Sequence, residues 1–162
     1  MSLFLILLAA GDSKRFKSKI PKPFHKVNNQ TLLEHSINEF KGFPEIKKIF
    51  VVYNKKHKKL IDKISIKEVS WIKGGSTRQK STYIALKKIK KLNCKKIIIH
   101  DCARPGISKE LIKNLIKKLK KNNAVIPVIK TYDATKRIKK KTIFKNINRN
   151  NLMFAQTPQG FS

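Results

Sequence analysis

A stretch near the start of the chain combines small residues with positive charge. Ala9, Ala10 and Gly11 follow an apolar run, and Arg15 and Lys22 come soon after. Small side chains let a nucleobase or phosphates approach the backbone, and amides in such a turn bind anions. Cations there would hold a triphosphate in line for transfer at phosphorus and offset the charge that develops. The stretch matches neither the GxxxxGK loop nor GxGxxG, and a basic surface loop stays open as the alternative.

A second loop places two glycines before a capped helix. Gly74 and Gly75 precede Arg78 and Ser81. Free amides at the positive end of a helix dipole form a favourable seat for a phosphate or a nucleobase carbonyl, and Arg78 would add charge. Taken alone, this stretch is better explained as an ordinary turn between a strand and a helix.

A third loop carries one of only nine acidic residues in the chain, Asp101. A carboxylate at the end of a buried strand is costly unless it meets a cation, and Mg²⁺ is commonly held by one or two carboxylates plus substrate phosphates. The sequence therefore predicts Asp101 as a metal ligand. An ion pair between Asp101 and Arg104 that closes the turn is the alternative. We expect His100 to be structural and Cys102 to be a small packed side chain.

Short apolar runs rich in branched side chains are predicted to be the buried strands that carry these loops. They cover residues 3–8, 46–53, 69–72, 97–99 and 124–129. The amphipathic segments between them begin at helix-capping residues, namely Thr31 with Glu34, Ser76 with Gln79, and Ser108. This alternation predicts a three-layer α/β fold, with a mainly parallel sheet covered on both faces and ligands at the carboxyl ends of its strands.

The sequence after Ile129 is polar and basic and lacks a long helical period. We expect residues 130–151 to form an extended hairpin arm that leaves the body of the domain. No linker rich in glycine, serine or proline divides the chain, so residues 1–162 are expected to form a single domain.

The chain of 162 residues has a formal net charge of +30. A charge of this size attracts polyanions, which makes nucleic acid a candidate partner. The basic residues, however, are 34 lysines and only 5 arginines, spread over every segment and not interleaved with stacking aromatic residues. Base and phosphate recognition favours arginine. We therefore favour solvated helix faces over a nucleic-acid surface.

Other classes of protein are disfavoured by the hydrophobic pattern and the cysteines. No apolar run approaches the roughly eighteen residues of a membrane span. No positive residue precedes the first apolar run, as it would in an export signal. Cys94 and Cys102 form neither a disulfide framework nor a zinc pattern. These features predict a cytoplasmic protein.

Five short motifs stand along this chain in an order and spacing that can be compared with those of known families. They are Leu8-Ala-Ala-Gly11 with Arg15 and Pro21-Lys22, Gly74-Gly75 with Arg78 and Ser81, His100-Asp-Cys-Ala-Arg-Pro105, Asp133-Ala-Thr-Lys-Arg137, and Asn148-Arg149 through Gln156-Thr-Pro-Gln159. Over essentially the whole chain they resemble the 2-C-methyl-D-erythritol 4-phosphate cytidylyltransferases. The first motif is shared with sugar nucleotidyltransferases in general, whereas the third and the last are specific to this family and close relatives.

The resemblance implies a Rossmann-like nucleotidyltransferase fold that transfers CMP from CTP to 2-C-methyl-D-erythritol 4-phosphate, releases pyrophosphate and uses Mg²⁺. It implies that the triphosphate is stabilised by Arg15 and Lys22 and the metal held by Asp101. The implied nucleotide-binding residues are Ala9, Ala10, Gly11, Gly74, Gly75, Arg78, Ser81, Asp101 and Cys102. The implied substrate-binding residues are Arg104, Thr157 and Arg149, the last reaching across an arm-exchanged homodimer.

The chain departs from the family pattern at several positions. Ser13 replaces a usual glycine, Ala134 a common threonine, Asn148 a usual aspartate, and Cys102 an alanine or glycine. The family domain continues past residue 162, so we expect a C-terminally truncated fragment, poorly active alone, of a protein that could carry a fused second pathway enzyme. Two other functions stay open: a nucleotidyltransferase acting on another alditol phosphate, such as ribitol 5-phosphate, and a polyanion-binding protein.

Overall fold

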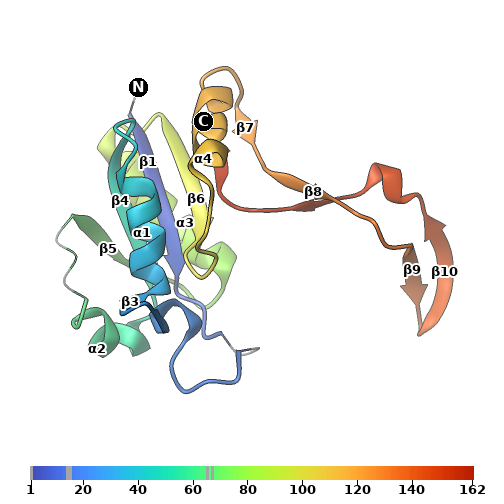
Figure 1. The fold of residues 1–162 in the computed structure, drawn as a ribbon, viewed down its shortest axis with the longest axis horizontal. Helices are drawn as coiled ribbons and strands as arrows, with labels where there is room; N and C mark the ends of the chain where they lie inside the picture. The colour runs from blue at the N-terminus through green and yellow to red at the C-terminus, as the bar shows by residue number, and fades with distance from the viewer. Residues whose placement is uncertain (1, 14–15, 65, 67) are drawn as a thin grey trace.

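The computed structural model describes residues 2–13, 16–64, 66 and 68–162. Within these residues, a six-stranded sheet has the order β5-β4-β1-β6-β12-β7 (Figure 1). Its strands are β1 (Leu3–Ala9), β4 (Ile46–Tyr53), β5 (Val69–Lys73), β6 (Lys96–Asp101), β7 (Ala124–Val125) and β12 (Gln159–Phe161). The first four of these run parallel, and β12 is antiparallel to both β6 and β7. The predicted mainly parallel sheet is confirmed.

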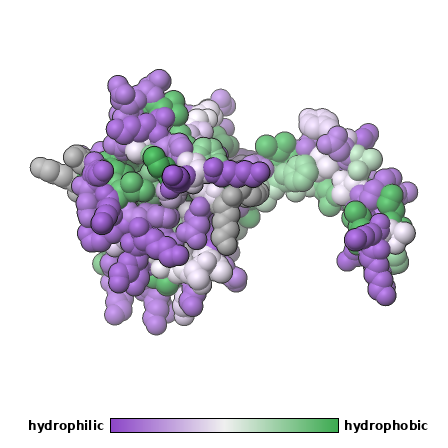
Figure 2. All heavy atoms as spheres, turned by 90° about the horizontal axis from the view of Figure 1, so that it is seen from below, coloured by the Kyte–Doolittle hydropathy of each residue, from purple (hydrophilic) through white to green (hydrophobic). Residues whose placement is uncertain are grey.

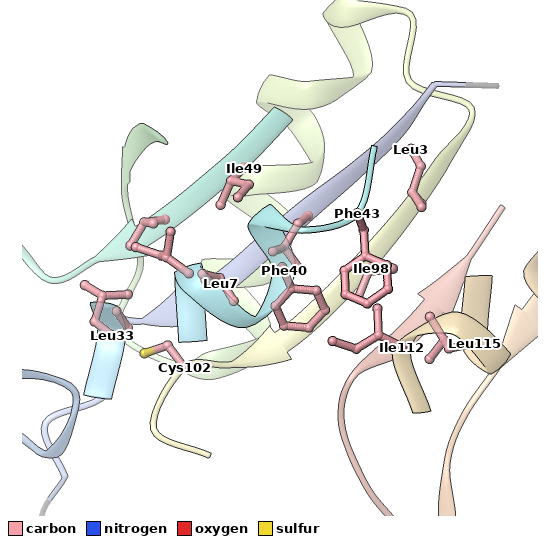
Figure 3. Packing of buried hydrophobic residues seen from close by; sticks show 14 of the residues in the cluster. Leu3, Leu7, Leu33, Phe40, Phe43, Ile49, Ile98, Cys102, Ile112 and Leu115 are labelled. Atoms are coloured by element: carbon pink, nitrogen blue, oxygen red, sulfur yellow. The ribbon is translucent and has the colours of Figure 1, made fainter. Parts of the chain in front are cut away.

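Helices cover both faces of this sheet, because successive side chains of its strands point to opposite sides. They are α1 (Leu32–Lys41), α2 (Lys58–Ile61), α3 (Arg78–Ile89) and α4 (Lys109–Leu119). From β1, Leu3 and Leu7 pack with residues of α1 and α4, such as Phe40 and Ile112 (Figure 3). Phe4, which follows Leu3 in β1, belongs to a second buried cluster that contains residues of α3. The predicted three-layer α/β fold is confirmed.

The helix starts follow the predicted capping residues with one exception. Thr31 and Glu34 form the capping box of α1, and the hydroxyl of Ser108 accepts a hydrogen bond from the backbone N–H of Leu111, at 3.1 Å, in α4. The prediction that Ser76 caps the third segment is wrong. Thr77 is the N-cap of α3 and accepts from the backbone N–H of Lys80 at 3.0 Å. The later start leaves Ser76 in the glycine loop.

The strand predicted at 124–129 is divided in two at Pro127, which has no N–H to give to a ladder. Before it, β7 belongs to the main sheet; after it, β8 (Val128–Lys130) pairs with β11 (Met153–Ala155). Between these two strands lies the hairpin of β9 (Thr135–Lys139) and β10 (Thr142–Ile147). We call residues 128–155 the arm, because they project from the body of the protein (Figure 1). The range predicted to project, 130–151, lies inside the arm.

The remaining elements are short. A two-stranded ribbon joins β2 (Lys26–Val27) and β3 (Gln30–Thr31), and 3₁₀ turns cover residues 22–24, 55–57, 90–92 and 149–151. Among the described helices, none is long and apolar enough to cross a membrane.

Candidate active site

A cleft of about 980 Å³ opens where β1, β4, β5 and β6 end. This volume is in the range of small-molecule sites, and the carboxyl ends of parallel strands are where α/β folds bind ligands. The three loops predicted from the sequence all contribute to it. The predicted site residues that line it are Ala10, Gly11, Lys22, Gly74, Gly75, Arg78, Ser81, Asp101 and Arg104.

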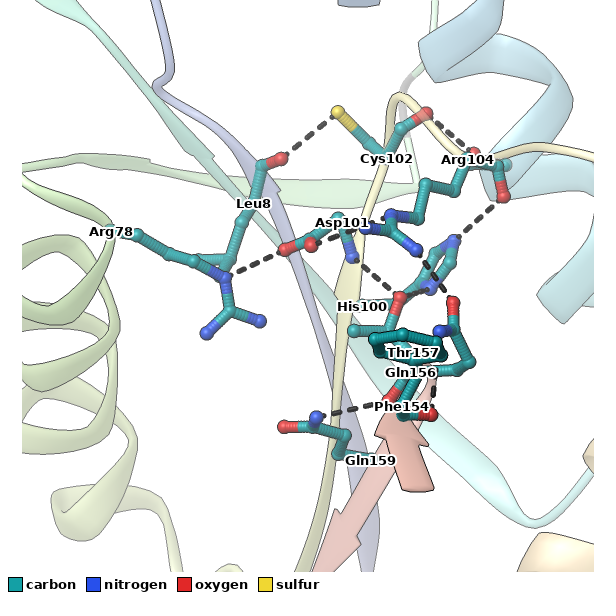
Figure 4. A network of polar contacts seen from close by, with 11 residues as sticks. Leu8, Arg78, His100, Asp101, Cys102, Arg104, Phe154, Gln156, Thr157 and Gln159 are labelled. Atoms are coloured by element: carbon teal, nitrogen blue, oxygen red, sulfur yellow. Dashed lines mark hydrogen bonds and ion pairs between the residues drawn. The ribbon is translucent and has the colours of Figure 1, made fainter. Parts of the chain in front are cut away.

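Two of the predicted nucleotide-binding residues lie behind the wall of the cleft. Ala9 is buried within β1. Cys102 is also buried, and its thiol donates a hydrogen bond to the carbonyl of Leu8 at 3.1 Å (Figure 4). Burial raises the pKa of the Cys102 thiol far above its usual range, so the side chain is a neutral packing group. Arg15, the other predicted catalytic cation, lies outside the described residues.

Two of the predicted substrate-binding residues also lie away from the lining of this cleft. Arg149 lies on the arm, where its guanidinium donates to the carbonyl of Tyr132 at 2.6 Å. Thr157 follows the arm and lies behind Asp101, whose backbone N–H donates to its hydroxyl at 3.5 Å. A substrate bound in the cleft of one chain would therefore meet Arg149 only if the arm belonged to another copy or moved.

Ser13 connects the two ends of the first loop. Its backbone lies in the left-handed region, at φ 51°, which glycine adopts with less strain than other residues. Its carbonyl accepts from the N–H of Phe16 at 2.7 Å, and its hydroxyl accepts from the N–H of Lys22 at 3.0 Å. A glycine at this position could not make the second bond. Serine therefore fixes the backbone of Lys22 at the cleft.

The second loop packs against the first, and Gly74 is the point of contact. A Cβ atom at Gly74 would lie 2.8 Å from Oγ of Ser81 and 2.9 Å from Cβ of Ala10. Because real Cβ atoms do not approach so closely, only glycine fits. The Ser81 hydroxyl accepts from the N–H of Gly75 at 3.1 Å and so holds the loop against α3.

The third loop brings the carboxylate of Asp101 between two arginines (Figure 4). Oδ1 lies 2.9 Å from Nε of Arg78, and Oδ2 lies 3.9 Å from Nε of Arg104. The ion pair anticipated as an alternative is present, but the closer partner is Arg78, 23 residues earlier in the chain. The side chain of Asp101 is 28% exposed, so solvent and ligands can still reach it.

The cleft also contains polar residues that were not predicted. Asp12 follows Gly11, and Nδ2 of Asn54 donates to its Oδ1 at 3.0 Å. Lys55, Lys56 and Lys73 line the same cleft. The sequence did hold a signal for Asn54 and Lys73, because both stand at the end of a predicted strand, where ligands bind in this class of fold.

The acidic residues of the cleft suit a divalent cation that also binds phosphates. Asp12 and Asp101 both line it, while the described residues contain no cluster of three or more His, Cys, Asp or Glu side chains able to enclose a metal. Mg²⁺ is typically bound by one or two carboxylates, with substrate phosphates supplying further oxygens. The donor set therefore fits Mg²⁺ that arrives with a nucleotide.

His100 lies fully buried behind the third loop. Its Nε2 is 3.2 Å from the carbonyl of Arg104, and its Nδ1 is 2.8 Å from the hydroxyl of Thr157 (Figure 4). Burial lowers the pKa of His100 to about 4; the charge of Asp101 opposes this shift, and those of Arg104 and Arg78 assist it. His100 is therefore neutral near pH 7, as expected of a structural histidine.

Acidification is expected to destabilise the fold through His100. An unfolded chain takes up a proton at this residue near pH 6.5, whereas the folded chain resists it until about pH 4. The unfolded state binds more protons between these values, so the free energy of unfolding should fall by roughly 3 kcal/mol as the pH is lowered across the window. Urea unfolding at several pH values measures this. In the His100→Gln variant, the free energy of unfolding should depend less on pH. Equal pH dependence in the variant and the native chain would contradict the assignment of this effect to His100.

Comparison with known proteins gives a consistent result. A family model described as 2-C-methyl-D-erythritol 4-phosphate cytidylyltransferase matches residues 3–162. A "Bifunctional enzyme IspD/IspF" from Pelagibacter ubique is 47% identical over all of this chain, which spans 43% of that relative. A 2-C-methyl-D-erythritol 4-phosphate cytidylyltransferase from Clostridioides difficile is 34% identical over 97% of the chain, which spans 68% of it.

Solved structures agree with these sequence relatives. The bifunctional IspDF from Campylobacter jejuni superposes with a TM-score of 0.84 at 30% identity, covering 99% of this chain and 41% of its own. The 2-C-methyl-D-erythritol 4-phosphate cytidylyltransferase from Francisella tularensis gives a TM-score of 0.80 at 30% identity, covering 99% of this chain and 72% of its own. The chain thus spans less than half the length of the bifunctional relatives cited and about 70% of the single-activity ones.

Proposed function

Because the chain belongs to the 2-C-methyl-D-erythritol 4-phosphate cytidylyltransferase family, we propose that its cleft transfers CMP from CTP to 2-C-methyl-D-erythritol 4-phosphate. One observation carries the proposal: glycine-loop amides, cations and a carboxylate from three separate strand ends line a single cleft. Transfer at phosphorus depends mainly on positioning and on fixed charges, which such a cleft supplies. We also propose that residues 1–162 act as one nucleotidyltransferase domain.

In the proposed reaction, a phosphate oxygen of the acceptor attacks the α-phosphorus of CTP. The bond from that phosphorus to the bridging oxygen breaks, and pyrophosphate leaves with the electron pair. Lys22, and Arg15 by family resemblance, would offset the negative charge that builds up on the triphosphate. The N–H groups around Gly11 and Gly75 would face the phosphates or the base, since glycine backbones allow close approach.

Asp101 is the residue we assign to the metal. Mg²⁺ bound there would supply positive charge to the phosphates. In the structure the carboxylate is neutralised by Arg78 and Arg104, which are themselves suited to phosphate oxygens. The triphosphate would draw the guanidinium of Arg78 toward itself, and the acceptor phosphate would draw that of Arg104, which would leave Asp101 free to bind the cation.

We further propose that the arm joins two copies of the chain. Its hairpin exposes large apolar side chains, with Phe144 at 63% and both Ile138 and Ile143 at 66% exposed. Figure 2 shows such hydrophobic residues along the projecting arm. Apolar groups gathered on a protruding hairpin indicate a protein contact. In such a homodimer, Arg149 of the partner subunit would bind the acceptor phosphate. We place the reaction in the cytoplasm, which suits two free thiols.

Pyrophosphate release tests the proposed function directly. The full native chain is incubated with CTP and Mg²⁺, and with either 2-C-methyl-D-erythritol 4-phosphate or ribitol 5-phosphate as acceptor. We expect release that depends on the first acceptor. If ribitol 5-phosphate supports release and 2-C-methyl-D-erythritol 4-phosphate does not, or if neither acceptor supports release, the proposal is overturned.

Sedimentation of the Phe144→Glu variant tests the arm contact, since a buried charge there should favour the monomer.

A further inference from the structure

The segment that follows the arm is hydrogen-bonded to the wall of the cleft. Strand β11 ends at Ala155, and the next residue, Gln156, accepts a hydrogen bond at Oε1 from Nη1 of Arg104 at 2.8 Å. The backbone N–H of Gln156 donates to the carbonyl of Pro127 at 2.8 Å, where the arm leaves the body. Both strands at the root of the arm are thus fixed next to Arg104.

His100 makes the second connection between the arm root and Arg104 (Figure 4). The carbonyl of Arg104 can only accept, so Nε2 of His100 must carry the ring proton and donate it at 3.2 Å. Nδ1 then has a lone pair and accepts from the hydroxyl of Thr157 at 2.8 Å. The chain Thr157, His100, Arg104 has one consistent set of proton positions, and it runs from the arm root to the cleft.

The backbone on both sides of Arg104 is held by two further hydrogen bonds, of which the first is buried and the second exposed. The hydroxyl of Ser36 donates to the carbonyl of Cys102 at 2.8 Å, and the N–H of Gly106 donates to Glu39. Both partners come from α1. With its ends fixed to the helix layer, the loop can move its middle, at Arg104, only by changing the contacts of Arg104 to Asp101, His100 and Gln156.

We propose that His100 is a positioning residue that transmits the position of the arm to Arg104, and so sets where the Arg104 guanidinium lies in the cleft. This inference rests on the proposed function only for the test that measures the rate of CMP transfer. His100 is buried and is not among the residues that line the cleft, so it acts through Arg104. His100 contacts Arg104 and Thr157, whereas Gly75 and Ser81 hold the second loop through their own hydrogen bond.

The expected effect is therefore selective. In the His100→Leu variant, the transfer rate at saturating CTP should fall about tenfold, the usual consequence of losing one or two buried hydrogen bonds at a positioning group. The affinity for CTP should stay within about twofold, because the glycine loops are untouched. His100→Gln, whose amide N–H can still donate to the carbonyl of Arg104, should recover most of the rate. The proposal would be overturned if CTP affinity fell as much as the transfer rate, and if His100→Gln lost as much of both as His100→Leu.

A spectroscopic measurement decides the inference without any turnover. Nitrogen-15 NMR of the native chain should show His100 protonated at Nε2 alone. Thr157→Val should shift the Nδ1 and Arg104 Nε resonances, and Thr157→Ser should restore them. The Phe144→Glu change in the arm should also move the Arg104 Nε resonance. An Arg104 Nε resonance that moves in neither Thr157→Val nor Phe144→Glu would overturn the proposal, even if CMP transfer is confirmed. Shifts as expected in a chain that fails to transfer CMP would support the proposal and refute the proposed function.

Discussion

Replacement of Lys22 by methionine is expected to slow CMP transfer about 10²- to 10³-fold, the range found when one preorganised charge is removed from a transition state. Methionine keeps an unbranched side chain but carries no charge. Lys22 lines the cleft, and its backbone N–H donates a hydrogen bond to Ser13. The backbone that carries the ammonium group is therefore fixed in position at the cleft. Single-turnover measurement of pyrophosphate release with bound CTP isolates the effect on the chemical step.

The control for Lys22 must lower the net charge equally at a site outside the cleft. Lys113, an exposed residue of α4 that does not line it, meets this requirement. Lys113→Met should leave the rate within about twofold, since a single surface charge is largely screened by salt. Equal losses in the two variants would mean that the overall charge of the chain, and not the position of Lys22, matters.

Replacement of Asp101 by asparagine is the second large effect expected. Asparagine keeps the shape of the side chain but removes the charge that we assign to Mg²⁺, so transfer should again fall about 10²- to 10³-fold. Binding of CTP should also lose most of its dependence on Mg²⁺. Titration of CTP by calorimetry, with Mg²⁺ present and then with EDTA, measures this dependence.

Asp62→Asn is the matched control for Asp101. Asp62 is an exposed acid that pairs with Lys58 in α2, outside the cleft. Its loss should change neither transfer nor the Mg²⁺ dependence of CTP binding. If Asp101→Asn keeps that dependence in full, the metal is held elsewhere, and Asp12 becomes the residue to test next.

Much of the fold could be predicted because its signals are local. The run 46–53 is a strand with the predicted bounds, and Thr31 and Ser108 cap the helices they were expected to cap. Each signal depends on residues within one turn or one strand. The mainly parallel sheet then follows from the alternation of such segments.

What could not be predicted depends on contacts between distant segments. Strand β12 has only the residues Gln-Gly-Phe, and its pairing with β6 and β7, which come from distant parts of the sequence, makes it a strand. The pair of Arg78 and Asp101 joins two loops that are neighbours only in the folded sheet. Ala9 belongs to a matching motif, yet it points into the core from β1, which motif matching does not detect, whereas the buried Cys102 is the small packed side chain that its residue type predicted.

The position of β12 has a consequence for folding and for variation of the chain. Among the described strands, β7 pairs with β12 alone, so β7 can join the main sheet only when the ends of the intervening segment, residues 126–158, have met. The entropic cost of closing such a loop rises slowly, by about 0.6 kcal/mol for each doubling of its length. Insertions or deletions at the tip of the hairpin should therefore scarcely alter the stability of the body. The length of the arm can therefore vary almost independently of the body of the protein.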